Sequence, residues 1–557
     1  MRRCPRLALL ACLAAAAALS LPRPAAAAKP PTLPLVAAGS TAVGGLAEAD
    51  TFRATVQPDS NGRRIGQLLG VSVEWDRVSD YANDRWSRVF SQLGPSPIIR
   101  IGGSSSEDLT QVPGDATWAA LRHLAKTAGA RYIINLKLSG GDLPLISGLY
   151  SRAISEVGPS IDSFELGNEP SHWPNGVGGY DFATKAFTPG WDAYTDYYVK
   201  VAKELVKVNG GYQFLGLSWE HFRSGLPRDK QAAFVAAARG TNMRELALHW
   251  YPPYTSDGFS IDDLLREGLL REAVKEFQDA SASAGGLPIR MSEGNTKSKG
   301  GIAGVSDAFA SALFATDFAF ELAAAGSPGV NLHWRIGGSP DGAPNRNWPC
   351  YYLGVETGFR PGPNGALDTY PKAKAPWAGY LLFSRAVASE GGPATLARVP
   401  YAAASGACSN VKIWPLAARR GGGAELRVVV LNKSPSGACR VALRLEPGSG
   451  GPARYGAGSL QWMLPGGASA AAVAGCASKD GCGAAAGGLG VASTRGDSTM
   501  GGQAMDQEGR LQPGSPVTYE VAGARAGDGG AMEYTFALPA ASGALLTVPE
   551  AKARRRA

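Results

Sequence analysis

Two glutamates near the ends of apolar runs are the clearest candidates for chemistry in this sequence. Glu169 ends the run IDSFELGNE (161–169), and Glu293 lies near the end of PIRMSEG (288–294). A pair of carboxyl groups flanking a bond is the usual equipment for glycoside hydrolysis, where one protonates the leaving oxygen and the other attacks the anomeric carbon or activates water. A single glutamate at a strand end is more often only solvated, so the hypothesis depends on the pair.

Other polar residues end similar runs. Asn168 could bind a sugar hydroxyl, and Pro170 restricts the turn that directs Glu169. Arg100 could form a purely structural ion pair, but a cation beside Glu293 would also keep that carboxyl group ionised. For the aromatic and histidine candidates, packing in a core is the alternative. The remaining candidates are Glu74, Ser104, His249, Trp250 and Tyr251.

Eight short apolar runs, with helical stretches between most of them, would position these residues. Continuous apolar strands separated by helices are typical of a parallel sheet that is buried on both faces. Eight such units over roughly 250–320 residues have the size of a (β/α)8 TIM barrel, whose active site lies at the carboxyl ends of the strands. A doubly wound sheet is the alternative, but 100–104 lacks the glycine spacing of its phosphate loop. The runs are 68–74, 97–103, 132–139, 161–169, 214–219, 246–252, 288–294 and 329–335.

The rest of the chain differs in its sequence pattern from the predicted catalytic barrel, 66–385. Alternating, β-branched runs between Gly, Pro and Ser predict an antiparallel β-sandwich domain over 386–550, with a low-complexity loop at 466–490. Strands expected in 29–65 would join that sandwich. Residues 1–28 have the basic, apolar and small-residue regions of a signal peptide, so we expect a secreted protein without a membrane-spanning segment in its mature chain.

The charge distribution argues against nucleic acid as a partner. The net charge of +8 divides into +4 from residues 1–28 and +4 from the basic tail 551–557, which leaves 29–550 formally neutral. A basic balance confined to the two ends says little about a surface that binds polyanions. The spacing of His, Cys, Asp and Glu predicts no metal site, and we expect no cofactor.

Five cysteines follow the predicted signal peptide, so one thiol would be left over in an oxidising compartment. Asn432 begins a glycosylation sequon, although Pro435 directly after it makes the acceptor less favourable. Plausible disulfides join Cys408 to Cys439 and Cys476 to Cys482, with Cys350 apart.

Segments of the predicted barrel, taken in order, resemble glycoside hydrolase family 79, the β-glucuronidases and heparanases. FELGNEP (164–170) is similar to the acid/base motif of that family, and MSEGNT (291–296) to its nucleophile segment. The resemblance spans most of 66–385 and, more loosely, a later segment, 493–513. Gly294 departs from the pattern, where Thr is common, as do two lysines in the loop that follows. The other similar segments are Leu68–Glu74, Ile99–Ser106, His249–Tyr251, 304–318, 330–334 and Trp377–Phe383, and the lysines are Lys297 and Lys299.

The resemblance implies a retaining double displacement with Glu293 as nucleophile and Glu169 as acid/base. It also implies a sugar pocket in which neutral hydroxyl and amide groups bind the uronic carboxylate, without metal or cofactor. The implied residues that bind the sugar hydroxyls are Glu74, Ser104 and Asn168, and His249 is a further expected substrate-binding residue. The implied carboxylate-binding groups are Tyr251, Tyr351 or Tyr352, and backbone N–H near Gly300 and Gly301.

Three functions are compatible with these residues. The long segment 171–192 after Glu169 favours an exo-acting β-glucuronidase on the ends of glucuronic-acid-containing glycans, because such a segment can close one end of a cleft. An endo-acting, heparanase-like enzyme would need an open cleft lined with cations, which the neutral 29–550 disfavours. A catalytically silent carbohydrate-binding or scaffold protein on the same fold would have no reason to keep both Glu169 and Glu293.

Overall fold

The computed structural model describes most of the predicted barrel and sandwich, and every structural statement below concerns these residues. The predicted signal peptide, nearly all of the low-complexity loop 466–490 with Cys476 and Cys482, and residues 552–557 of the basic tail lie outside them. The described ranges are 32–34, 51–57, 62–220, 227–252, 258–334, 350–362, 367–397, 408–447, 454–466, 468, 492–526 and 530–551.

Eight parallel strands close into a barrel, which confirms the predicted fold class. The last strand pairs with the first in register, Val330 with Leu69 and Trp334 with Val73. The strands are buried along almost their whole length, as continuous apolar runs require. In barrel order they are β4 (Leu69–Val73), β5 (Ile98–Ile101), β6 (Arg131–Leu136), β7 (Ile161–Leu166), β10 (Phe214–Trp219), β11 (Met243–Trp250), β12 (Ile289–Gly294) and β13 (Val330–Trp334).

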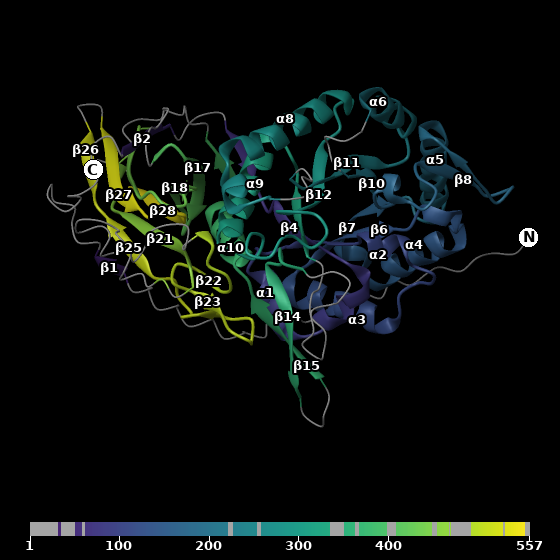
Figure 1. Cartoon of the computed structure of the whole chain (residues 1–557), viewed down its shortest axis with the longest axis horizontal. Helices are drawn as coiled ribbons and strands as arrows, with labels where there is room; N and C mark the ends of the chain where they lie inside the picture. Colours follow the sequence, from purple (N-terminus) through teal and green to yellow (C-terminus); the bar gives the residue numbers. More distant parts are fainter. Residues whose placement is uncertain are drawn as a thin grey trace, which may run out of the picture.

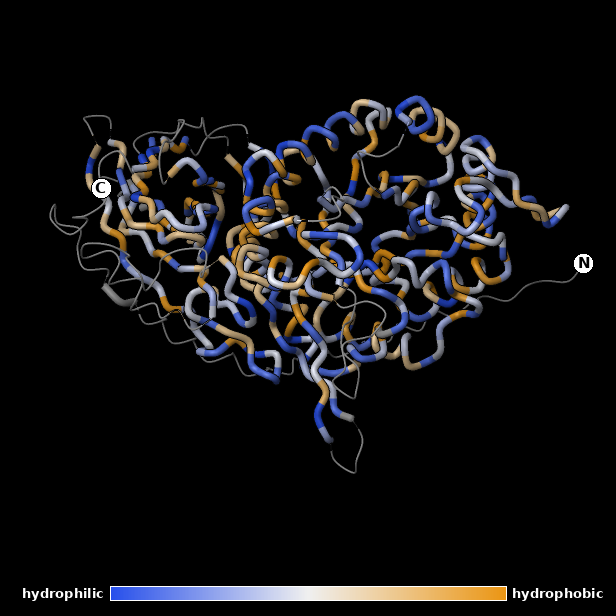
Figure 2. The backbone as a smooth tube through the Cα atoms, in the orientation of Figure 1, coloured by the Kyte–Doolittle hydropathy of each residue, from blue (hydrophilic) through white to orange (hydrophobic). Residues whose placement is uncertain are grey.

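Helices surround the strands and turn their apolar faces inward (Figures 1 and 2). In α3, the buried residues Trp118, Leu121 and Leu124 recur at helical spacing, and the helix ends at Gly129, whose φ of 66° suits a residue without a Cβ. The principal helices are α1 (Asp84–Ser91), α3 (Asp115–Ala128), α4 (Leu143–Val157), α5 (Trp191–Val208), α6 (Arg228–Ala237), α8 (Glu267–Ser283), α9 (Ala310–Ala325) and α10 (Pro376–Val387). Two shorter ones are α2 (Ser104–Glu107) and α7 (Ile261–Leu265).

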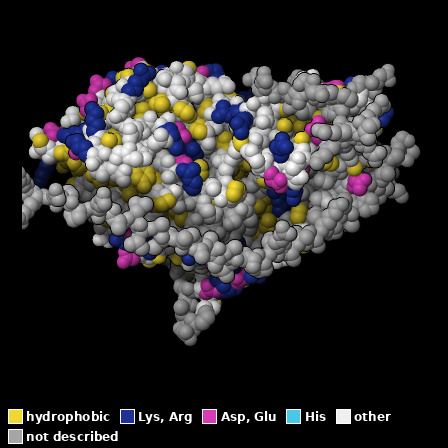
Figure 3. All heavy atoms as spheres, turned by 180° about the vertical axis from the view of Figure 1, so that it is seen from behind, with side chains coloured by type: hydrophobic (Ala, Val, Ile, Leu, Met, Phe, Trp, Pro, Cys, Tyr) yellow, Lys and Arg dark blue, Asp and Glu magenta, His cyan; other side chains and the backbone are white. Residues whose placement is uncertain are grey.

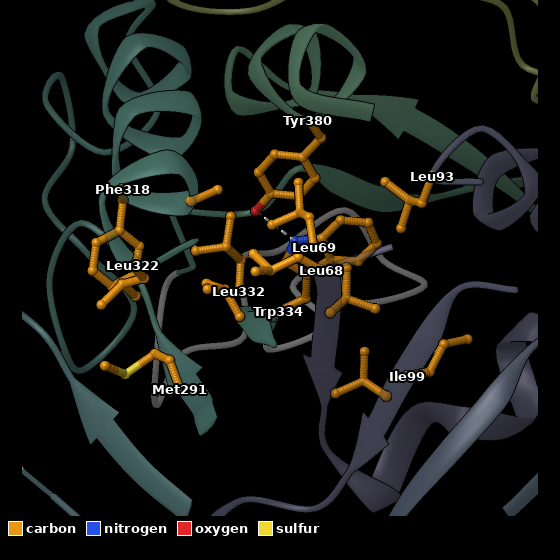
Figure 4. Packing of buried hydrophobic residues seen from close by; sticks show 14 of the residues in the cluster. Leu68, Leu69, Leu93, Ile99, Met291, Phe318, Leu322, Leu332, Trp334 and Tyr380 are labelled. Atoms are coloured by element: carbon orange, nitrogen blue, oxygen red, sulfur yellow. Dashed lines mark hydrogen bonds between the residues drawn. The ribbon is translucent and has the colours of Figure 1, made fainter. Parts of the chain in front are cut away.

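Helices α9 and α10 are apolar on nearly every side because they lie between the barrel and the second domain (Figure 1). Figure 4 shows Trp334, at the end of β13, directed toward Tyr380 of α10. The indole Nε1–H of Trp334 donates a hydrogen bond to the Tyr380 hydroxyl at 3.0 Å. This bond satisfies a buried donor at the boundary between barrel and helix layer.

Two mainly antiparallel sheets form the predicted sandwich, and both contribute to one apolar core, for example through Val430 and Val441. The N-terminal strands lie in it: β2 pairs with β19, and β3 with β16. The larger sheet contains β1 (Thr32–Pro34), β3 (Arg63–Ile65), β16 (Ala394–Leu396), β17 (Val411–Arg420), β18 (Gly423–Asn432), β20 (Arg454–Tyr455), β21 (Gly458–Pro465), β22 (Ser498–Met500), β25 (Thr518–Val521) and β28 (Ser542–Ala551). The smaller contains β2 (Thr51–Val56), β19 (Cys439–Leu445), β26 (Gly523–Ala526) and β27 (Ala531–Leu538).

Two details of the sandwich bear on covalent modification. Cys408 and Cys439 form a disulfide with a Cα–Cα distance of 5.2 Å, as predicted. Asn432 is fully buried, and its side-chain Nδ2 donates to the carbonyl oxygens of Gly437 and Pro539 at 2.8 and 2.9 Å. The sequon at Asn432 is therefore inaccessible in the folded chain, because its amide nitrogen is buried and hydrogen-bonded.

Two hairpins project from the barrel half (Figure 1). The segment 171–192, expected to be a loop, contains β8 (Gly178–Asp181) paired with β9 (Ala186–Pro189), which rests on α5. A second hairpin, β14 (Val355–Pro361) with β15 (Leu367–Ala373), follows β13, and a short one, β23 (Ala504–Met505) with β24 (Leu511–Gln512), follows β22. The sequence patterns did not predict the second hairpin.

The surface charges of the described residues are mixed. On the face seen in Figure 3, lysine and arginine side chains stand in separate groups among acidic and apolar ones. This arrangement agrees with the formally neutral balance of 29–550. Within the described part of the chain, no helix has both the length and the apolar character needed to cross a bilayer.

Candidate active site

Arg100 on β5 organises the carboxyl end of the barrel. Its fully buried guanidinium donates to Glu165 at 2.5 Å, to Glu293 at 2.6 Å and to the side-chain oxygen of Asn168 at 2.7 Å. A third strand contributes Ser72, whose Oγ accepts at 3.0 Å. The planar, fork-shaped guanidinium thus fixes residues of β4, β7 and β12 relative to one another.

Glu169 follows β7 in an unusual backbone conformation. Its φ of 42° and ψ of 67° lie in the left-handed region, which a side chain with a Cβ rarely adopts. The surrounding contacts hold it there: its N–H donates to Ser218 at 3.0 Å, and the N–H of Asn168 donates to Glu107 at 2.7 Å. Such strain is retained where a side chain must point in one direction.

Glu293 and Glu169 approach each other across the barrel mouth. One oxygen of each, together with a ring nitrogen of His249, forms a group in which all atoms lie within 4.8 Å of one another. His249 Nδ1 is 2.9 Å from Glu169 and 3.9 Å from Glu293. The Tyr251 hydroxyl donates to the other oxygen of Glu293 at 2.8 Å. The two carboxyl groups therefore lie next to each other at the carboxyl ends of the barrel strands.

The surroundings lower the pKa of both carboxyl groups. Burial alone would raise the pKa of Glu293, but His333, His249 and Arg100 outweigh it and hold that pKa below its usual range. Burial would likewise raise the pKa of Glu169, yet hydrogen bonds to His172 and His249 hold it well below the usual range. In the empty site both groups are carboxylates, which suits Glu293 as a nucleophile directly and requires that Glu169 obtain a proton before it can act as an acid.

Glu74 lies at the end of β4, on one side of this pair. One of its oxygens accepts hydrogen bonds from the N–H and hydroxyl of Ser105, and the other is 3.4 Å from His333 Nε2. Ser104 is exposed nearby, and both serines line a cavity of about 470 Å³ with Glu74. The predicted pair Glu74 and Ser104 therefore shares one concave surface that adjoins the carboxylates through His333, which lies 3.8 Å from Glu293.

The predicted carboxylate-binding tyrosines require a correction. Tyr352, not Tyr351, is buried beside the site, with its ring centroid 6.4 Å from that of Tyr251 and 6.1 Å from that of His333. Tyr351 is half-buried, and its contact is a backbone one, from its N–H to the carbonyl oxygen of Gly300 at 2.6 Å. The burial of Tyr352 beside Tyr251 and His333 favours its ring over that of Tyr351 as the one next to the carboxylates.

The backbone near Gly301 supports this correction. Gly300 and Gly301 have φ values of 87° and 83°, and a Cβ at Gly301 would lie 3.3 Å from the Tyr352 ring. Tyr251, in contrast, uses its hydroxyl proton on Glu293. That contact assigns Tyr251 to the orientation of Glu293, whereas its contact with a sugar carboxylate stays a prediction.

Several site residues were not predicted from the sequence. Glu165 lies inside β7, and His333 within β13, where the apolar pattern gives no sign of a polar network. His172 and Glu220 lie just after β7 and β10, with His172 Nδ1 3.0 Å from Glu169 and its Nε2 2.8 Å from Glu220. Their positions directly after barrel strands were the available signal.

Two groups of side chains have ligand atoms close enough for a cation: Glu169 with His249 and Glu293, and Glu169 with His172 and Glu220. In both groups an imidazole nitrogen already contacts a carboxylate at 3.0 Å or less. The carboxylates are thus partly neutralised by the chain's own side chains, and the arrangement is suited to proton transfer and nucleophilic attack.

Neither the known protein-family models nor the curated proteins include a match to this sequence. Among solved structures, the chain is similar to a 4-O-α-L-rhamnosyl-β-D-glucuronidase from Fusarium oxysporum, with 18% identity, a TM-score of 0.63 and coverage of 89% of this chain and 100% of the other. It is also similar to a GH51 arabinofuranosidase from Xanthomonas axonopodis (13%, 0.58, 89% and 99%) and a β-xylosidase from Caulobacter crescentus (14%, 0.53, 90% and 100%). At these identities the comparisons show that the chain shares its fold, barrel and sandwich together, with proteins described as glycosidases.

Proposed function

We propose that this protein is a retaining glycoside hydrolase that removes β-linked glucuronic acid from the end of a glycan or glycoconjugate. The observation that carries the proposal is the pair formed by Glu169, which follows β7, and Glu293 of β12, with oxygens within 4.8 Å of each other. Retaining enzymes place their two carboxyl groups about 5–5.5 Å apart, whereas inverting enzymes need a wider gap for water.

In this proposal Glu293 attacks the anomeric carbon. Arg100 and Tyr251 hold its two oxygens at 2.6 and 2.8 Å and so fix the direction of attack. Glu169 protonates the departing oxygen, and the glycosyl group becomes an ester of Glu293. Glu169 then takes a proton from water, which displaces Glu293 from the same face of the sugar as the lost group, so the β configuration is kept.

The glucuronic acid assignment has narrower support. Tyr352 is buried beside Tyr251 and His333, and Gly301 lies against its ring, so these neutral groups are the candidates to contact a sugar carboxylate. One structural neighbour is described as a glucuronidase, although others are described as an arabinofuranosidase and a xylosidase. The family 79 resemblance of FELGNEP and MSEGNT points the same way.

The cavity beside Glu74 favours a second candidate. Its volume of about 470 Å³ leaves room next to the sugar-binding residues for another unit of the substrate. An enzyme that cleaves next to a substituted or internal glucuronic acid, as in an endo-acting, heparanase-like reaction, would use that space. The β8–β9 hairpin, which follows Glu169, instead favours exo action because it can limit one end of the cleft.

Aryl glycosides with one leaving group test the proposal. We expect the 4-nitrophenyl β-glucuronide to exceed the β-glucoside and β-xyloside by at least ~10²-fold in kcat/KM, because donors built for a carboxylate are left unpaired by the analogues. Equal rates on the three substrates would refute the specificity for glucuronic acid, but the proposal that the protein is a glycosidase would stand. Absence of turnover on all of these, α-arabinofuranoside included, would favour a silent binding protein. Chain shortening of a glucuronic-acid polymer, without release of monosaccharide, would favour endo action.

A further inference from the structure

His172 differs from the other two imidazoles near the carboxylates. His249 and His333 belong to barrel strands and are buried, whereas His172 lies in the short 3-10 helix η5 (Pro170–His172) with 62% of its side chain exposed. It bridges two carboxylates, with Nδ1 3.0 Å from Glu169 and Nε2 2.8 Å from Glu220. It is therefore the imidazole that connects Glu169 with solvent.

The number of protons in this bridge follows from its contacts. The contact of Nδ1 with Glu169 is a hydrogen bond, whereas the contact of Nε2 with Glu220 Oε2 is close but lacks hydrogen-bond alignment, so it is favourable only if the ring is charged. A neutral imidazole carries one N–H, so two such contacts require one more proton, on the ring or on a carboxyl group. Glu169, His172 and Glu220 together thus hold an extra proton next to the group that must donate one.

The other carboxylate oxygen of Glu169, Oε1, has no comparable source of an extra proton. His249 Nδ1 contacts it at 2.9 Å, which a single N–H satisfies, and His249 is fully buried. Its Nε2 has no hydrogen-bond partner among the described residues. The Glu169 side chain is itself only 14% exposed, so among the described side chains His172 is the exposed imidazole in contact with it.

We propose that His172 is a positioning residue that stores, between Glu169 and Glu220, the proton that Glu169 delivers to the leaving group. The inference rests on the proposed function. The proton moves from Nδ1 to Glu169, then to the glycosidic oxygen as its bond to the anomeric carbon breaks and the bond to Glu293 forms. When water attacks, Glu169 takes its proton and returns it to His172, so each cycle consumes one water and no net proton.

The charges around His172 keep the proton available at neutral pH. Among the described residues it faces Glu169 from the end of β7 and Glu220 from the end of β10, and Glu169 in turn faces His249 of β11 and Glu293 of β12. Hydrogen bonds and charges of Glu169 and Glu220 outweigh partial burial and raise the pKa of His172 to about 10. A bound leaving group displaces water from the bridge, and a drier site favours transfer to the neutral pair.

The test compares His172→Gln and Glu220→Gln with the wild type and with His123→Gln. His123 on α3 is a matched control because it also contacts one carboxylate, Asp84 at 3.3 Å, but on the outside of the barrel. For each protein, kcat/KM is measured against pH on 4-nitrophenyl and phenyl β-glucuronides, or on whichever glycoside the wild type hydrolyses. A poor leaving group such as phenol depends most on the proton.

We expect His172→Gln to lose about tenfold or more on the phenyl substrate on the alkaline side, and its alkaline limb to fall by about one pH unit or more. Glu220→Gln should show a smaller shift in the same direction, and His123→Gln none. A uniform loss at all pH values, equal on both substrates, would overturn the inference and indicate that His172 only contacts the aglycone. A wild type inactive on all glycosides would instead refute the proposed function.

A second measurement does not depend on activity. In wild-type protein with ¹⁵N-labelled histidine, we expect an imidazole that keeps both ring nitrogens protonated well above pH 7. Glu220→Gln should lower the titration midpoint of that imidazole and leave His333, whose pKa Glu293 and Glu74 also raise, unchanged. If all observable imidazoles are neutral at pH 8, no proton is stored and the inference is wrong.

Discussion

Two clusters of buried charged residues in this molecule have similar residue types but different roles. At the barrel mouth, Glu169 and Glu293 face each other within 4.8 Å, and cations lie behind them. Between barrel and sandwich, Asp317 of α9 alternates with Lys412 and Lys433 at 3.2 and 2.8 Å. Like charges side by side store electrostatic repulsion that substrate can relieve, whereas alternating charges join two domains.

The interface cluster is closed and saturated. Lys412 also pairs with Glu321, Lys433 lies 3.5 Å from Glu267, and the Trp414 indole donates to Asp317 at 3.2 Å. At the mouth each oxygen of Glu169 and Glu293 also contacts a side chain, but the cluster adjoins, through His333, the cavity that Glu74 lines. The contrast suggests that charge removal should cost activity in one place and stability in the other.

Glu293→Gln should give the largest effect on activity. Loss of the nucleophile should lower kcat by ~10⁴-fold or more on every substrate, because no other group can form the glycosyl ester. The melting temperature should change little, because the repulsion between two facing carboxylates is lost together with one of the two ion pairs of Arg100, which keeps Glu165 as a partner. Kinetics and calorimetry on the same preparation check both parts. A variant that is active, or that melts well below the wild type, would contradict this view of the mouth.

Glu169→Gln should separate substrates by leaving group. We expect a loss of ~10²–10⁴-fold in kcat/KM on poor leaving groups and much less on 4-nitrophenyl, which needs little protonation. With Glu169→Ala, azide should restore turnover and yield the β-glycosyl azide, identified by mass spectrometry and NMR. Equal losses on both kinds of substrate would argue against Glu169 as the acid.

Asp317→Asn should affect stability and leave the chemical step unchanged. It leaves Lys412 and Lys433 with fewer carboxylates in a dry interface, so the free energy of unfolding should fall by about 3 kcal/mol. Burial would raise the pKa of Asp317, but the two lysines outweigh it and lower that pKa. The stabilisation is therefore present above the ordinary aspartate pKa and is lost as pH falls through the lowered value, so wild type and variant should converge in acid.

Urea unfolding at several pH values measures this effect. Asp279→Asn is the matched control, since Asp279 pairs with Lys275 on exposed α8 and should show no measurable change. Equal stability of Asp317→Asn and wild type at pH 7 would show that the interface charges do not join the domains.

Tyr251→Phe should have the smallest effect on activity. It distinguishes a role of Tyr251 in catalysis from a role in recognition of the sugar carboxylate. Removal of the hydroxyl that donates to Glu293 should slow turnover by about tenfold, as expected for a hydrogen bond to a charged group. If Tyr251 only orients Glu293, β-glucuronide and β-glucoside should slow equally. A shrinking ratio of the two kcat/KM values would instead assign Tyr251 to the sugar carboxylate.

The sequence predicted the barrel well because its strands are buried on both faces. Runs such as 214–219 coincide with β10, and 288–294 nearly coincides with β12, so Glu169 and Glu293 could be placed at strand ends. The two glutamates are 124 positions apart in the chain, and only the closed barrel brings them together. The order of apolar runs was sufficient for that inference.

The residues that the sequence did not predict were missed for a common physical reason. Glu165 and His333 lie within strands, where their partners come from other strands and no local pattern marks them. Lys412 lies within β17 and contacts Asp317 of α9, a partner that no local pattern marks. The choice of Tyr352 over Tyr351 depends on which way an irregular segment turns, which spacing alone does not determine.

Trapping of the covalent intermediate tests the central claim most directly. The wild type is incubated with 2-deoxy-2-fluoro-β-glucuronyl fluoride, whose fluorine slows release from the enzyme, and is then digested and mapped by mass spectrometry. We predict time-dependent inactivation, one added fluoroglucuronyl group, and its location on Glu293, with none on Glu293→Gln. A label on another residue, or a first product with inverted configuration by NMR from the ordinary β-glucuronide, would contradict the account.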